Sequence, residues 1–281
     1  MKNANKVSRS FQHMILLCGC LLIYYSVSAR QHKPTESGYI AQKTQGIDSD
    51  YVLIFNSYSE SAPWCRSLVD STVMDLIKLS PQTMTVTQNL NSGLLRDEKA
   101  LAQLRQQVDV SYHDKPRMII YIGSTSWPFL HETIEKKWGK VPSIIFSDID
   151  YTGPIANLLR KTPIAPALRI PYDKIVKEYE GALSVVYMPI YLRQSLALMH
   201  QLTPPMTELC FISDTRWISA QMRADMAAIT KTDFPELKVR YLISADMSTL
   251  DLLDSLQHYG QETGVLFFSW LKQSQVGDSF V

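Results

Sequence analysis

Residues 51–64, YVLIFNSYSESAPW, decide the fold class of this chain. The first six of them, Tyr51–Asn56, form a short run rich in residues that favour β-strands. The next stretch, Trp64–Leu79, has apolar residues at helical spacing. A short strand followed by a longer helix is the opening unit of an α/β fold with a parallel sheet.

The same alternation continues for the next hundred residues. Three more β-rich runs are expected to be strands: Thr83–Gln88, Arg117–Ile122 and Ser143–Ser147. Apolar residues at helical spacing predict two further helices between and after them, Glu98–Val108 and Trp127–Trp138. Residues 50–150 are therefore predicted to be a first Rossmann-like lobe with a parallel sheet.

A second lobe is predicted after a break in this rhythm. Residues 151–189 contain scattered prolines, which indicates a crossover or hinge region. Alternation then resumes with the helices Tyr191–Gln201, Trp217–Thr230 and Ser248–Tyr259, and with the strands Glu208–Ser213, Leu237–Ile243 and Gly264–Trp270. Eleven residues follow the last strand, too few for further βα units, so the second lobe at residues 190–281 is expected to be incomplete.

The N-terminal segment indicates export or membrane attachment. Residues 1–13 carry three cations and no acid, and the apolar run Met14–Val27 follows. Residues 1–29 therefore resemble either a signal peptide cleaved after Ala29 or an uncleaved anchor. A third alternative is lipidation of Cys20, although the apolar run continues beyond it.

Residues 30–49 are polar and without periodicity, which is typical of a tether. Because the cations precede the apolar run, we expect the body of the protein on the periplasmic side of the cytoplasmic membrane. The body contains two cysteines, Cys65 and Cys210, in different predicted lobes. They are expected to be buried thiols and not a disulfide.

Composition and motifs exclude several classes of function. The chain has 281 residues, 46% of them hydrophobic, with 28 basic and 27 acidic residues and a net charge of +1. Such a balance argues against a nucleic-acid-binding surface. The segment His131-Glu132-Thr133-Ile134-Glu135 begins like a zinc-protease helix but lacks the second histidine, and no dinucleotide or phosphate loop is present. We therefore expect no cofactor, no metal and no catalytic site.

Polar and aromatic residues gather instead at the expected carboxyl ends of the strands, where open parallel sheets bind ligands. The candidate ligand-binding residues are Ser57, Tyr58, Trp64, Ser124, Thr125, Ser126, Asp148, Asp214, Arg216 and Trp270. Hydroxyl and charged groups can hold a small polar molecule while aromatic rings stack on it. Each residue also has a structural alternative, as a helix cap, a turn former, a packed ring or a surface charge.

Several of these segments resemble a known family. The stretch Val52–Tyr58 followed by Pro63-Trp64 is similar to the start of ABC-transporter-type substrate-binding domains that serve as sensor inputs of bacterial histidine kinases. The segments Ile119–Ser126, Val141–Phe146 and Glu208–Asp214 also resemble that family. The resemblance covers most of residues 51–270 and implies two lobes of the type I periplasmic-binding-protein kind, which close on a ligand.

Three functions follow from this reasoning. The first is a sensor domain for an amino acid, a nucleobase or a sugar-like ligand, whose kinase region would lie beyond Val281. The second is the substrate-binding component of an importer, and the third is a hydrolase or isomerase that uses Asp148 or Asp214 as acid or base. The membrane is a partner through the N-terminal segment, and formation of a homodimer is left open.

Overall fold

The computed structural model describes residues 51–59, 62–203, 205–274 and 277–280. The predicted signal peptide or anchor and the predicted tether lie outside these residues. No helix in the described part of the chain is long and apolar enough to cross a membrane.

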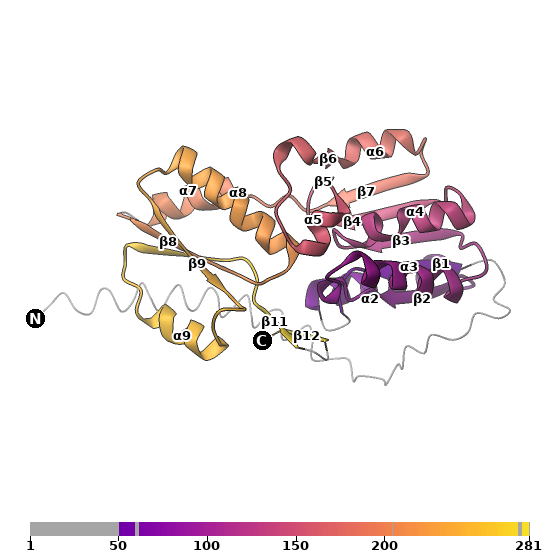
Figure 1. The fold of residues 1–281 in the computed structure, drawn as a ribbon, viewed down its shortest axis with the longest axis horizontal. Coiled ribbons are helices and arrows are strands. Elements are labelled where there is room, and N and C mark those ends of the chain that lie inside the picture. The colour runs from indigo at the N-terminus through magenta and orange to yellow at the C-terminus, as the bar shows by residue number, and fades with distance from the viewer. Residues whose placement is uncertain (1–50, 60–61, 204, 275–276, 281) are drawn as a thin grey trace, which may run out of the picture. The chain divides into compact units, whose positions relative to one another are not determined.

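The first sheet has five parallel strands (Figure 1). In spatial order they are β2 (Met84–Asn89), β1 (Tyr51–Asn56), β3 (Met118–Ile122), β4 (Ser143–Ser147) and β7 (Leu183–Tyr187). All six residues of β1 are buried, because this inner strand has neighbours on both edges and helices on both faces.

Side chains alternate between the two faces of this sheet, and different helices cover each face. Val52 and Ile54 pack against α2 (Pro63–Leu79). Leu53 and Phe55 join the larger core formed with α3 (Glu98–Ser111) and α4 (Ser126–Trp138). Shorter helical segments in this part of the chain include η2 (Ser92–Leu94), α5 (Ile155–Arg160) and α6 (Tyr172–Glu178).

The second sheet has three parallel strands. Their spatial order is β10 (Thr263–Phe267), β8 (Glu208–Ser213) and β9 (Lys238–Ile243). Helices α7 (Leu192–Leu202) and α8 (Trp217–Asp233) contribute to the larger core through one face of this sheet. Helix α9 (Thr249–Gln257) packs on the other face, where Cys210 and Ile212 of β8 meet Leu252.

Two short antiparallel pairs complete the described structure. Strand β5 (Tyr151–Thr152) pairs with β6 (Ile170–Pro171), beside the short helix η3 (Pro166–Leu168). Strands β11 (Leu271–Ser274) and β12 (Gly277–Phe280) pair with each other. The eleven residues after the predicted last strand therefore include a hairpin, which the sequence analysis did not predict.

The predicted α/β class with two parallel sheets is confirmed. The predicted range of strand β1 matches the structure, as do the ranges of β4 and β8. The structure differs at residues 151–189, which were expected to be a crossover but contain α5, α6 and β7. Strand β7 pairs with β4 and so belongs to the first sheet.

Cys65 and Cys210 are both buried free thiols, as expected. Each lies in the apolar core of a different sheet. Burial accordingly raises the pKa of both thiols.

Candidate ligand-binding site

A cavity of about 370 Å³ lies at the carboxyl ends of strands from both sheets. Its wall from the first sheet includes Tyr58 after β1, Asp148 after β4 and Met188 after β7. Its wall from the second sheet includes Arg216 at the start of α8 and Phe268 after β10. The complete lining is Tyr58, Ala62, Pro63, Trp64, Cys65, Asp148, Met188, Ile190, Arg216, Ile218, Phe268 and Ser269. A cavity of this size suits a small molecule.

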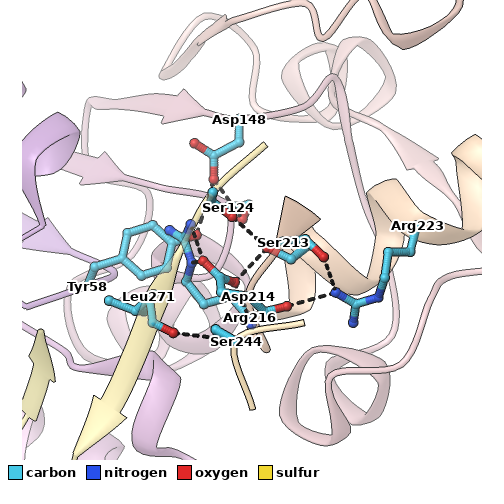
Figure 2. A network of polar contacts seen from close by, with 11 residues as sticks. Tyr58, Ser124, Asp148, Ser213, Asp214, Arg216, Arg223, Ser244 and Leu271 are labelled. Carbon is cyan, nitrogen blue, oxygen red and sulfur yellow. Dashed lines mark hydrogen bonds and ion pairs between the residues drawn. The ribbon is translucent and has the colours of Figure 1, made fainter. Parts of the chain in front are cut away.

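Asp148 is the acidic group of the described wall. Its Oδ2 accepts hydrogen bonds from Tyr58 Oη and Ser124 Oγ, each at 3.2 Å (Figure 2). Burial raises the pKa of this carboxyl group, while the charge of Arg216, the two hydroxyl donors and the backbone N–H of Ser124 act in the opposite direction. Burial therefore destabilises the ionised form of Asp148 unless a further partner stabilises it.

Arg216 is the basic group of the described wall, and it forms an ion pair with Asp214, which does not line the cavity. Arg216 Nε and Nη2 lie 2.9 and 2.8 Å from Asp214 Oδ2, and the backbone N–H of Arg216 donates to Asp214 Oδ1. Ser219 Oγ also donates to Oδ1, at 2.6 Å. Burial alone would raise the pKa of Asp214, but Arg216 and Ser219 together lower it, and Asp214 is therefore ionised.

Two contacts extend this network to its surroundings (Figure 2). The guanidinium carbon of Arg216 lies 5.1 Å from the centre of the Tyr58 ring, a cation–π contact that joins residues following β1 and β8. Arg223 Nη1 donates to Ser213 Oγ and to the carbonyl oxygen of Asp214. The turn between β8 and α8 is thus fixed on both sides of Asp214.

Four of the ten predicted binding residues line the cavity: Tyr58, Trp64, Asp148 and Arg216. Ser124 and Asp214 stand directly behind them, as the partners of Asp148 and Arg216. Thr125 lines a small adjoining hollow of about 10 Å³, which shares Tyr58, Arg216 and Ile218 with the cavity and has room for one water molecule at most.

Ser57 and Ser126 have structural roles instead. Ser57 Oγ accepts the backbone N–H of Ser126 at 2.9 Å, which links the end of β1 to the start of α4. Ser126 Oγ donates to the carbonyl oxygen of Ile122. Gly123, which follows Ile122 in the chain, has a φ of +87°, and a Cβ at this position would come within 2.7 Å of Ser57 Oγ. The glycine is needed for this close approach.

Trp270 lies away from the cavity. It is 5% exposed, packs with Leu252 and donates its indole N–H to Thr249 Oγ1. Strand β10 ends at Phe267, whereas the sequence predicted that it ends at Trp270. The residues that follow the strand end, Phe268 and Ser269, are therefore the ones that reach the cavity.

Sequence reasoning missed the apolar part of the lining. Met188 and Ile190 follow β7, a strand that was not predicted, and Ile218 is the second residue of α8. Phe268 was placed inside a strand. A search for apolar residues directly after strands would have found Phe268 once the end of β10 was known, whereas Met188 and Ile190 carry no distinctive signal.

The surroundings of the ionisable groups limit the chemistry that each can perform. Within the described ranges, no group of three or more His, Cys, Asp or Glu residues could hold a metal ion. Cys65 lines the cavity, but its raised pKa keeps it a thiol, which is a poor nucleophile. Asp214 is committed to Arg216 and Ser219, and its lowered pKa makes it a weak base.

A scan against models of known protein families finds no match for this chain, and a search of curated protein sequences finds no significant relative.

Proposed function

We propose that the protein is an extracytoplasmic small-molecule-binding sensor domain with a fold of the type I periplasmic-binding-protein kind. The observation that carries this proposal is the cavity of about 370 Å³ whose lining comes from strand ends of both sheets. A ligand that contacts both walls favours the arrangement in which they lie close together, so binding shifts a conformational equilibrium.

The wall composition supports binding over catalysis. Aromatic and aliphatic side chains surround one carboxylate and one guanidinium, which is the usual make-up of a small-molecule site. The residues behind the wall hold its polar groups in place, since Ser124 contacts Asp148 and Asp214 contacts Arg216. Such preorganisation reduces the entropy lost on binding.

The test is a thermal-unfolding screen of the full chain against amino acids, nucleobases and sugars. A ligand that binds the folded state raises the unfolding midpoint, and the shift grows with concentration above the dissociation constant. Trp64→Ala should abolish the shift, because Trp64 lines the cavity. Trp138→Ala removes the same type of side chain at the C-terminal end of α4, outside the cavity lining, and should leave the shift in place.

Two results would contradict the proposal. One is the absence of any shift across the panel, and the other is a shift that Trp64→Ala leaves unchanged. Product formation from a screened compound would favour an enzyme instead. Genetic linkage to a permease and an ATPase would favour the importer component, whereas an uncleaved N-terminal segment and a kinase encoded in the same frame would favour the sensor.

A further inference from the structure

The two charged groups that line the cavity, Asp148 and Arg216, differ in their partners. Arg216 forms its ion pair with Asp214, whose side chain is fully buried. Among the ion pairs of the described residues none involves Asp148, which has two neutral hydroxyl donors.

Two further cations nearby, Arg223 and Lys161, do not line this cavity. Lys161 lines the small hollow of about 10 Å³ and is absent from the lining of the larger cavity. Its Nζ donates to the carbonyl oxygen of Gly93 at 2.7 Å. A ligand in the larger cavity therefore meets two charged groups of the lining, Asp148 and Arg216.

The shape of the Arg216 site disfavours an anionic ligand. The guanidinium edge formed by Nε and Nη2, which carboxylates bind in a bidentate manner, is already occupied by Asp214. A second carboxylate would also lie near Asp148, and like charges in a water-poor site repel each other.

The remaining wall suits an apolar body. Trp64 and Phe268 are partly exposed rings, and Met188, Ile190 and Ile218 add aliphatic surface. Tyr58 already has the guanidinium of Arg216 against its ring. Aromatic faces attract cations, and they also stack on rings. A sugar, in contrast, would leave hydroxyl groups without partners against these walls.

We infer that the cavity selects a small organic cation, a primary amine attached to an aromatic or branched apolar group, with its ammonium at Asp148. This inference rests on the proposed function, because it assigns the ligand class of the same cavity. The ammonium supplies the partner that Asp148 lacks, and the apolar group occupies the space between Trp64 and Phe268.

The test uses four compounds that share one ring: 2-phenylethylamine, 2-phenylethanol, 3-phenylpropionate and L-phenylalanine. Their affinities for the full chain are measured by isothermal titration calorimetry at pH 7. The amine should bind about tenfold more tightly than the alcohol, or better, because its hydrogen bond to Asp148 joins two charges. The propionate should bind most weakly.

Variants locate the effect at one carboxylate. Asp148→Asn should reduce the affinity for the amine to that for the alcohol, while the affinity for the alcohol stays the same. Asp150→Asn makes the same change two residues away, at an exposed position outside the lining, and should leave the preference intact. The comparison of amine and alcohol on the unaltered protein needs no variant and stands even if Asp148→Asn fails to fold.

The outcomes separate this inference from the proposed function. Equal affinity for amine and alcohol, tighter binding of L-phenylalanine than of the amine, or binding of none of the four compounds overturns the inference. The proposed function still stands if another compound of the broad panel gives a shift that depends on Trp64, and falls if none does.

Discussion

Removal of the Asp214 carboxylate should destabilise the protein strongly. Its side chain is fully buried, accepts three hydrogen bonds and neutralises Arg216, whose side chain is 14% exposed. In Asp214→Ala the guanidinium would stay in the interior without the carboxylate that contacts it directly. Breaking a buried ion pair in this way typically costs about 3–5 kcal/mol of the free energy of unfolding.

The effect should depend on pH, with a sign that the structure fixes. The folded state lowers the pKa of Asp214 below its ordinary value of 3.8, because Arg216 and Ser219 outweigh the opposing effect of burial. Its stabilising contribution is therefore complete above about pH 4 and is lost as the pH falls through the lowered pKa. The difference between Asp214→Ala and the unaltered protein should be largest at neutral pH and shrink in acid.

Urea denaturation followed by far-UV circular dichroism measures this difference. The matched control is Asp70→Ala, which breaks the exposed pair of Asp70 with Arg66, where the charged atoms lie 3.6 Å apart and the side chains are 57% and 60% exposed. The control should cost about 0–1 kcal/mol. The double change Asp214→Ala with Arg216→Met should recover part of the loss, because no unpaired charge is then buried. A loss equal to that of the control, or no recovery in the double variant, would refute the reasoning.

Two other changes test the turns around the cavity. Asp148→Asn should raise the stability of the ligand-free protein at neutral pH, because burial raises the pKa of Asp148 and makes its ionisation unfavourable to folding. This gain in stability should vanish as the pH falls towards 3.8, the ordinary pKa of the group. A difference in unfolding midpoint that is negative, or that stays constant with pH, would contradict this. Gly123→Ala should cost about 1–3 kcal/mol from its φ of +87° and more from the contact with Ser57. Gly139→Ala is the control, because Gly139 also has a positive φ, +71°, but has open space around it. If chemical denaturation gave the same loss of unfolding free energy for both variants, the contact with Ser57 would be unimportant.

The alternation of strands and helices could be predicted because it depends on local patterns. The run Tyr51–Asn56 is apolar throughout and buried throughout, so its sequence and its environment agree. Residues 151–189 were misjudged because their prolines were interpreted as breaks. Instead, Pro154 and Pro171 directly precede helices α5 and α6, where a missing N–H is harmless.

The candidate site was predicted less completely than the fold. To identify the residues that reach the cavity, the end of each strand must be known to within one residue. An error of three residues at the end of β10 moved the expected contact from Phe268 to Trp270. Periodicity determines the presence of a strand better than its last residue.

Hydrogen-bond saturation explains why the hydroxyl groups of the predicted site contribute less than expected. Buried polar groups need partners, and at this strand end the backbone supplies them first. Ser57 and Ser126 bond to backbone groups, and Thr125 Oγ1 donates to Ser92 Oγ, so their hydroxyls already have partners. Asp148 retains acceptor capacity, because a carboxylate offers about four lone-pair positions and accepts two hydroxyl donors here. A ligand therefore meets Asp148 and the already paired Arg216 among apolar side chains, in place of the hydroxyl-lined wall that the sequence predicts. This difference favours an amine over a sugar.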